Sequence, residues 1–415
     1  MADILPLTAL RYDLDRTGGL QDVVAPPYDV IDPEQRAQLL ARSGFNIVGV
    51  DLPVGGEDRY DRAAALLADW KHEGVLVRDQ TPALWTLEQD YTGPDGRQRI
   101  RSGFFARVRV EDYGAGRIRP HERTHPGPKE DRLRLTRATA TNLSPIFSLY
   151  SDPDRVAVAA LAGAEPWAQV TDPDGTVNRL GRVTDAEAIG AARAALADTE
   201  LLIADGHHRY ETARVYAQEI GGEGPHRYVL MCLVALEDPG LTVFPTHRLV
   251  RGLSAEQHER LAGVLRDAFT ITELRDRAGL APHSDDRVRI GYLDRAARTP
   301  VMLTLKDQAI ADAALGDHAA PYRRLDTAVL EALVLKGALG MSDHDIDELT
   351  GLGYARDFDQ ALELVDSGAF DAAFFMAPTP VERVQEVAAA GESMPPKSTY
   401  FVPKVGTGYV LNPLR

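Results

Sequence analysis

Two Pro-Asp-Gly turns constrain the fold of this 415-residue chain more than any other feature. They occupy 93–96 and 172–175. Apolar and polar residues alternate on both sides of each turn, over 83–92, 97–111, 167–171 and 177–183. Alternation around a tight turn is typical of a β-hairpin, because every second side chain of a strand faces the same side. Each turn therefore predicts a pair of antiparallel strands.

Other segments predict helices that alternate with strands. Residues 201–204 form a short apolar strand, Asp205-Gly206 turns the chain, and 207–219 is expected to be a helix. The most apolar strand is expected over 227–236, in the centre of a sheet. Further helices are predicted at 34–42, 57–72, 185–197, 255–268, 327–339, 343–350, 358–366 and 381–390. This combination predicts a mixed α/β protein.

Composition argues against several functions. The formal charge of −16 would repel a nucleic-acid backbone, so no nucleic-acid partner is expected. The longest uncharged apolar run, 228–236, is too short for a membrane-spanning helix of about 20 residues. The single cysteine, Cys232, forms no disulfide framework and is expected to pack in the core. With no signal-peptide pattern at the start, these features indicate a cytoplasmic protein without a membrane partner.

Three regions are expected along the chain. Residues 1–118 form a mixed N-terminal region with a hairpin. Residues 119–250 form a core that carries the most reactive segments, and 251–415 form a more helical C-terminal region. Part of this last region, 391–401, is expected to return to a site in the core.

The segment 201–210 carries the strongest chemical signal. Its strand ends in Asp205-Gly206, so the N–H groups and the positive dipole end of the next helix lie at the turn. His207, His208 and Arg209 fall in the first helical turn, where cations are normally disfavoured. We therefore expect Gly206 to Arg209 to bind an anion, with phosphate the natural candidate. Asp205 is expected to bind a metal that accompanies the phosphate, or else to cap the helix.

A second segment, 119–132, contains a match to the zinc-protease pattern, His121-Glu122-Arg-Thr-His125. That pattern needs a helix that brings both histidines to one face. Pro126 and Pro128 oppose such a helix, and at most one turn is expected to form. We therefore interpret the segment as a polar loop.

Such a loop could supply catalytic and phosphate-binding groups. Glu122 is the candidate general base, and Lys129 and Arg132 are candidate phosphate ligands. A solvated loop without a chemical role is the alternative.

A third segment, 391–404, nearly matches the phosphate-loop pattern. Pro396 replaces the second glycine and has no N–H for a phosphate, and a strand rather than a helix is expected to follow. We expect a basic, hydroxyl-bearing loop in which Lys397 and Ser398 contact an anion. The chain has only six lysines against forty arginines, so each retained lysine, including Lys404, is of interest.

Two further places could shape a site. Tyr28 and Asp29 follow Pro26-Pro27 in a rigid turn, and His247 ends a strand after Pro245. Both places also have a purely structural interpretation.

These segments together resemble the bacterial and archaeal family known as domain of unknown function 1015. The matching stretches follow one another over nearly the whole chain, at 25–31, 121–135, 144–150, 203–213, 245–249 and 391–404. The family has no settled activity, so the resemblance implies little about chemistry.

A more distant resemblance implies more. Asp205-Gly-His-His-Arg209 is similar to the signature of free-serine kinases in the ParB/sulfiredoxin-like superfamily. This resemblance implies a ParB/sulfiredoxin-like core at 119–250, elaborated with hairpins and a helical C-terminal part. By the same resemblance, His121-Glu122 corresponds to the upstream pair whose glutamate acts on the hydroxyl, and Asp205 holds Mg²⁺ or orients that hydroxyl. His207, His208 and Arg209 then hold the phosphates, as phosphoryl transfer requires positioning and charge neutralisation.

The sequence thus favours a phosphotransferase with an alcohol acceptor, using ATP or ADP with Mg²⁺ to phosphorylate serine or a similar metabolite. Two alternatives remain open. One is a nucleotide-binding switch, and the other is a metal-dependent phosphoesterase built on four histidines, His121, His125, His207 and His208. The oligomeric state is left open.

Overall fold

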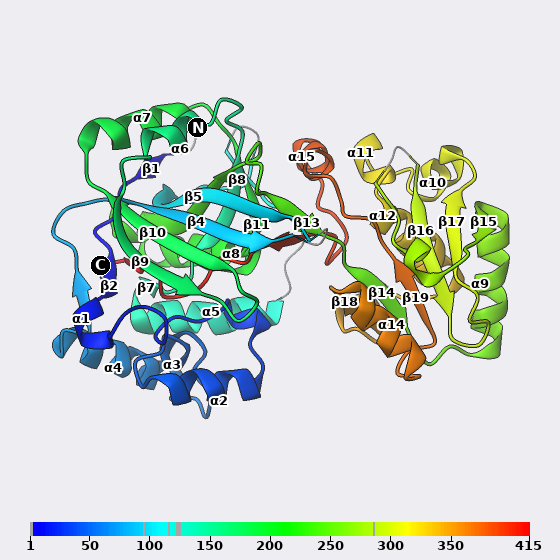
Figure 1. The fold of residues 1–415 in the computed structure, drawn as a ribbon, viewed down its shortest axis with the longest axis horizontal. Helices are drawn as coiled ribbons and strands as arrows, with labels where there is room; N and C mark the ends of the chain where they lie inside the picture. The colour runs from blue at the N-terminus through cyan, green and yellow to red at the C-terminus, as the bar shows by residue number, and fades with distance from the viewer. Residues whose placement is uncertain (1–2, 94–95, 115–116, 122–125, 285–286) are drawn as a thin grey trace. The chain divides into compact units, whose positions relative to one another are not determined.

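The computed structural model describes residues 3–93, 96–114, 117–121, 126–284 and 287–415. The chain divides into two compact units. Unit 1 contains the described residues within 1–120, 124–242 and 403–415, and unit 2 contains those within 121–123 and 243–402. Figure 1 shows the elements of each unit. Among the described residues, no helix combines the length and the apolar character needed to cross a membrane.

Unit 1 is built on a mixed sheet with nine strands in the described part of the chain. The order is β6-β11-β8-β12-β5-β4-β10-β9, and β1 pairs with the far end of β5. Apolar β12 lies inside the sheet, as its composition predicts. It runs parallel to β8 and antiparallel to β5. The strands are β1 (Ile4–Leu5), β4 (Leu84–Thr92), β5 (Gln98–Arg109), β6 (Ile118–Arg119), β8 (Ile146–Tyr150), β9 (Glu165–Thr171), β10 (Val177–Val183), β11 (Leu201–Asp205) and β12 (Tyr228–Ala235).

Both predicted hairpins are confirmed. β4 pairs with β5 from Trp85 opposite Phe105 to Thr92 opposite Gln98. β9 pairs with β10 from Val177 opposite Thr171, with a register shift after Leu180. The turn chemistry and the alternation were therefore sufficient to place these four strands.

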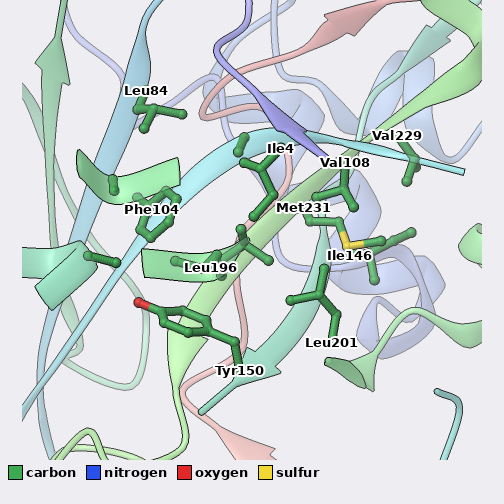
Figure 2. Packing of buried hydrophobic residues seen from close by; sticks show 14 of the residues in the cluster. Ile4, Leu84, Phe104, Val108, Ile146, Tyr150, Leu196, Leu201, Val229 and Met231 are labelled. Carbon is green, nitrogen blue, oxygen red and sulfur yellow. The ribbon is translucent and has the colours of Figure 1, made fainter. Parts of the chain in front are cut away.

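One face of the sheet packs against α6 (Val156–Ala160), α7 (Ala186–Leu196) and the start of α8 (His207–Ile220). Figure 2 shows the buried cluster that results. Phe104, Met231 and Leu201 come from three strands, and Leu196 comes from α7. Cys232 follows Met231 in β12, so its side chain points to the opposite face of the sheet. It is completely buried, as predicted for a packing residue.

The segment after His121 differs from its prediction as a loop. α5 (Pro126–Thr139) is a helix of 14 residues that begins at the first of the two prolines. Proline is tolerated in a first helical turn, because the N–H groups there have no partner within the helix. Pro126 and Pro128 therefore mark the start of this helix rather than interrupt it. Residues 122–125, including Glu122 and His125, lie outside the described residues.

Smaller elements complete unit 1. They are β2 (Leu10–Tyr12), α1 (Leu14–Thr17), η1 (Tyr28–Val30), α2 (Pro33–Arg42), α3 (Val48–Asp51), α4 (Arg59–His72), β3 (Leu76–Arg78), β7 (Thr141–Asn142), η2 (Pro225–Arg227) and β21 (Asn412–Pro413).

Residues 403–415, the C-terminal strap, belong to unit 1 (red in Figure 1). Thr407 and Ala25 exchange two backbone hydrogen bonds of 2.7 and 3.1 Å. β21 pairs with β7 through Asn412 opposite Asn142. The strap therefore ties the turn near Tyr28 to the segment between α5 and β8.

Unit 2 is built on a six-stranded sheet, β15-β17-β16-β19-β14-β18, together with the pair β13 and β20. Its main helix, α9 (Ala255–Ala268), starts with a capping box on Ser254. The strands are β13 (Thr242–Phe244), β14 (His247–Val250), β15 (Phe269–Glu273), β16 (Arg289–Asp294), β17 (Val301–Leu305), β18 (Leu352–Ala355), β19 (Ala372–Phe375) and β20 (Tyr400–Val402). The other helices are η3 (Arg277–Leu280), α10 (Gln308–Ala314), α11 (Ala320–Arg323), α12 (Asp326–Leu330), η4 (Glu331–Ala338), α13 (Asp343–Asp347), α14 (Phe358–Asp366) and α15 (Val381–Ala389).

The protein is a mixed α/β protein, as the sequence predicts. The two units divide the chain differently from the three expected regions. β4 and β5 from the expected first region share a sheet with β8, β10 and β12 from the second. The strap from the expected third region also joins them. Strand pairing between distant segments, which periodicity does not specify, accounts for the difference.

Candidate active site

Asp205 and Gly206 form the junction between β11 and α8. Gly206 has a φ of +95°, in the left-handed region that favours glycine. A Cβ at this position would lie 2.9 Å from Nε of Arg209. The glycine therefore permits both the turn and the close approach of Arg209, and α8 begins directly after it with His207.

Two cations hold the carboxylate of Asp205. Arg209 Nη2 donates to Oδ2 at 2.9 Å, and Lys404 Nζ donates to Oδ1 at 3.2 Å. The Asp205 side chain is only 20% exposed. Burial raises its pKa, but the charges of Lys404 and Arg209 outweigh burial and hold the pKa well below its usual range. Asp205 is therefore ionised at neutral pH, beside two positive charges.

Lys404 reaches Asp205 because buried groups hold the backbone of the strap. Gln89 Nε2 donates to the Lys404 carbonyl oxygen at 3.1 Å. Arg101 Nη2 donates to the carbonyl oxygen of Pro403 at 2.6 Å, and its Nε donates to Gln89 Oε1 at 3.1 Å. Arg101 also lies over the ring of Phe147, with 4.5 Å to the ring centroid. The residue before Lys404 is thus fixed from inside the sheet.

A small pocket lies beside this junction within unit 1. Tyr28, Asp51, Arg132, Ser144 and Arg209 are among the residues that line its volume of about 40 Å³. The Arg132 guanidinium lies 4.2 Å from the Tyr28 ring centroid. Ser144 Oγ donates to Asp51 Oδ2 at 3.1 Å, and Arg132 Nη1 donates to the Asp51 carbonyl oxygen at 2.6 Å. The pocket thus combines two arginines with one buried aspartate.

Burial controls the ionisable groups of this pocket. It raises the pKa of Tyr28 to about 12, although Arg209 and Arg132 act in the opposite direction. It also raises the pKa of Asp51, opposed by the same two arginines. Tyr28 therefore keeps its phenolic proton at neutral pH and can act as a hydrogen-bond donor.

The other predicted residues of unit 1 differ in exposure. His207 is buried, His208 and Lys129 are half-buried, and Asp29 is exposed. His207 also lowers the pKa of Asp205, with a smaller effect than Lys404 and Arg209.

Of the predicted site residues that the structure describes, four belong to unit 2: His121, His247, Lys397 and Ser398. His121 is buried, with its Nε2 2.6 Å from Thr399 Oγ1. His247 accepts the Met376 N–H on Nδ1 at 3.1 Å, and burial lowers its pKa to about 4. His247 therefore acts as a neutral packing residue in its unit.

Lys397 and Ser398, the predicted phosphate-loop pair, also have structural roles to consider in unit 2. Ser398 is buried, and its hydroxyl donates to the Pro395 carbonyl oxygen at 2.6 Å. Lys397 is exposed and has a φ of +57°. The serine hydroxyl is thus committed to its own turn.

The described residues do not fit a protein-held Mg²⁺ at Asp205. Both carboxylate oxygens already accept from cations, and the described part of the chain holds no group of three His, Cys, Asp or Glu side chains placed for a metal. Mg²⁺ prefers several oxygen ligands in octahedral geometry. The arrangement suits an anion better than a cation.

Sequence reasoning did not assign Asp51 or Ser144 to the site, and it noted Lys404 without giving it a role. Lys404 had a detectable signal, since it is one of only six lysines. Asp51 and Ser144 had none, because their approach depends on the packing of α3 against the segment before β8.

Comparison with known proteins gives a family. The family model for proteins of unknown function DUF1015 matches residues 4–328. No curated protein matches the sequence significantly.

Three solved structures illustrate the more distant likenesses. A conserved hypothetical protein from Pyrococcus furiosus is 15% identical, with a TM-score of 0.36, over 69% of this chain and 88% of that chain. A variant free serine kinase in complex with ADP is 13% identical, with a TM-score of 0.37, over 69% and 84%. SbnI with a C-terminal truncation, from Staphylococcus aureus, is 12% identical, with a TM-score of 0.37, over 72% and 84%. These values are too low to support an inference about activity. The family match covers most of the chain, and the protein therefore belongs to the DUF1015 family of proteins of unknown function.

Proposed function

We propose that the protein transfers a phosphoryl group between a nucleotide and a small hydroxyl metabolite, with free serine as the leading acceptor. The observation that carries the proposal is the convergence of Arg209 and Lys404 on Asp205 at the N-terminus of α8. Two cations against one carboxylate leave a positive charge where the helix dipole is also positive. Such a place favours phosphate.

The contacts suggest how a phosphate would bind. Its oxygens would accept hydrogen bonds from the N–H groups in the first turn of α8. Arg209 and Lys404 would share their positive charge between the phosphate and Asp205. Arg209 offers a planar guanidinium, while Lys404 offers a compact charge on a flexible stem. Asp205 would keep the two cations in place and orient the acceptor hydroxyl.

The proposed reaction is a single displacement. The acceptor oxygen attacks the terminal phosphorus of the nucleotide, and a new P–O bond forms. The bond from phosphorus to the bridging oxygen breaks, and the shortened nucleotide leaves with that electron pair. The hydroxyl proton passes to a base, for which Glu122 is the candidate. Positioning and charge neutralisation supply most of the catalysis of such transfers.

The experiment is mass spectrometry of the full-length protein incubated with L-serine, Mg²⁺ and either ATP or ADP. Phosphoserine should appear with the wild type and fall at least ~100-fold in both Asp205→Asn and Arg209→Met. The first removes the carboxylate that holds the two cations and orients the hydroxyl, and the second removes a cation from the phosphate site. Arg214→Met is the matched control, because Arg214 lies on the same helix and pairs with Asp112 and Glu211. It should retain activity.

Two results would overturn the proposal. One is the absence of phosphoserine and of any other phosphorylated hydroxyl compound when a panel of small metabolites replaces serine. The other is unchanged turnover in both Asp205→Asn and Arg209→Met.

Glu122→Gln tests the role of the base. Turnover should fall while nucleotide affinity, measured by calorimetry, stays within about twofold. A loss of both affinity and turnover would remove Glu122 from the proposed role. Slow nucleotide hydrolysis without any phosphorylated acceptor would instead indicate a switch protein.

A further inference from the structure

Two residues of α8 that line the small pocket each carry a buried donor without a hydrogen-bond partner in the described structure. The donors are Oγ1 of Thr212 and Nε of Arg209, three residues apart on the helix. Thr212 is 5% exposed. A buried donor without a partner costs about 1–3 kcal/mol, so native proteins rarely leave one unsatisfied. Two such donors on residues that line one pocket point to a ligand or ordered water there.

Other groups around the pocket are donors or cations as well. Arg132 lies on one wall, and Tyr28 keeps its phenolic proton because burial raises its pKa. Asp51 is the only acidic residue among those that line the pocket, within the described structure. Burial raises its pKa, and Ser144 donates to it. Arg132 already pairs with Asp131 and Asp51, and Arg209 with Asp205. What the pocket still offers a ligand is therefore hydrogen-bond donors, which suit a group rich in acceptor oxygens.

Volume limits what can enter. The pocket measures about 40 Å³, far below the ~300 Å³ of a typical site for a nucleoside or a drug-sized ligand. A single ordered water needs roughly 10–15 Å³ on the same measure. A compact group of a few heavy atoms is therefore the largest occupant that fits without rearrangement.

We infer that this pocket binds a small oxyanion group of the acceptor, either a carboxylate or a phosphate. The inference rests on the proposed function and narrows it, because the acceptor would then be a small anionic hydroxy compound. Thr212 Oγ1 and Arg209 Nε donate to the oxyanion, while Arg132, paired with Asp131 and Asp51, forms part of the pocket wall. Arg209 would thereby connect two places, since its Nη2 donates to Asp205 while the residue also lines the pocket and its Nε has no partner in the described structure.

Thr212→Val is the decisive variant, because valine keeps the shape of threonine and removes only the hydroxyl. Binding to the full-length protein without nucleotide would be measured by calorimetry with L-serine, inorganic phosphate and ethanolamine, which is serine without its carboxylate. We expect L-serine or phosphate to bind the wild type, ethanolamine to bind at least 10-fold more weakly, and Thr212→Val to weaken the oxyanion about 10-fold. The melting temperature of the free variant should stay equal or rise, since an unpaired buried hydroxyl is removed.

Thr139→Val is the matched control. Its hydroxyl is also buried on a helix but donates to the Leu135 carbonyl oxygen at 2.8 Å. This variant should lower the melting temperature and leave ligand affinity unchanged. Lys404→Met separates the two anion sites, because Lys404 does not line the pocket. Phosphate bound in the pocket should survive Lys404→Met and be lost in Thr212→Val.

The ligands that respond identify the source of the oxyanion. If Thr212→Val loses affinity only for L-serine, the oxyanion is a carboxylate. If it loses affinity only for inorganic phosphate, the oxyanion is a phosphate group. Equal affinity of wild type and Thr212→Val for both ligands would overturn the inference, as would a lowered melting temperature like that of Thr139→Val. Phosphoryl transfer to ethanolamine as fast as to serine would overturn it while leaving the proposed function standing. Oxyanion binding without any phosphoryl transfer would overturn the proposed function and leave this inference standing.

Discussion

At the scale of single residues, the charge of Asp205 depends on its neighbours. Its pKa is lowered relative to the unfolded chain, because Lys404 and Arg209 outweigh the effect of burial. A carboxylate with a lowered folded-state pKa adds stability above its unfolded pKa, and that stability is lost as pH falls through the folded value. The ion pairs at the site therefore contribute to folding at neutral pH as well as to the proposed chemistry.

Arg101 provides a prediction at this scale. Burial without a directly bonded carboxylate lowers its pKa to about 10, yet it donates to Gln89 and to the Pro403 carbonyl oxygen. Arg101→Met should keep the packing on Phe147 but leave two buried acceptors without a donor. We expect a loss of about 1–3 kcal/mol in the free energy of unfolding, measured with urea.

The same variant should also weaken phosphate binding, since Pro403 precedes Lys404. Arg179→Met is the control, because Arg179 is exposed and pairs with Glu88 and Asp90. Its effect should stay below ~1 kcal/mol. Full stability and full phosphate affinity in Arg101→Met would show that the buried guanidinium does not position the strap.

At the scale of elements, local sequence was informative where short-range chemistry sets the structure. The two Pro-Asp-Gly turns predicted both hairpins, and Asp205-Gly206 predicted the strand–turn–helix that carries the candidate site. α5 was not predicted, because Pro126 and Pro128 suggested an interruption rather than a first helical turn. A proline is compatible with the first turn of a helix and disrupts a helix interior, so by itself it does not predict where a helix starts.

The β9–β10 hairpin carries a pH-dependent prediction. Burial raises the pKa of Asp172 from 3.8 to about 6, and Asn178 Nδ2 donates to its carboxylate at 2.9 Å. Because the pKa is higher in the folded state, the protonated carboxyl favours folding. This contribution is complete below the unfolded-state pKa and is lost as pH rises through about 6.

Asp172→Asn should therefore match the wild type near pH 4 and exceed its stability near pH 8. The gain should be on the order of 1–2 kcal/mol after allowance for partial exposure. Thermal unfolding at both pH values measures it, with the wild type as the reference. An identical pH profile for Asp172→Asn and the wild type would contradict this account of the hairpin.

At the scale of the whole molecule, the pairing of the strap could not be predicted from the sequence. Residues 403–415 follow unit 2 in the chain, yet they pair with Ala25 and β7 in unit 1 and bring Lys404 to Asp205. No periodicity specifies which distant segment a strand meets, because register is set by tertiary packing. For the same reason, Asp51 and Ser144 could not be assigned to the site from sequence.

Removal of 403–415 should destabilise unit 1 in particular. Cys232 reports this directly, because it is the only cysteine and burial raises its pKa to about 12. A thiol-alkylating reagent should react very slowly with the intact protein and at least ~10-fold faster with the truncated one. Equal protection of Cys232 in both proteins would show that the strap does not hold unit 1 together.

The central claim is that Arg209 and Lys404 form a phosphate site with Asp205, and nucleotide binding tests it most directly. ADP and ATP would be titrated calorimetrically into the wild type, Lys404→Met and the control Lys71→Met, which removes a lysine from α4. Lys404→Met should weaken the affinity at least ~10-fold and reduce its dependence on salt, while Lys71→Met should bind like the wild type. Equal nucleotide affinity in all three proteins, or no binding to the wild type, would contradict the claim.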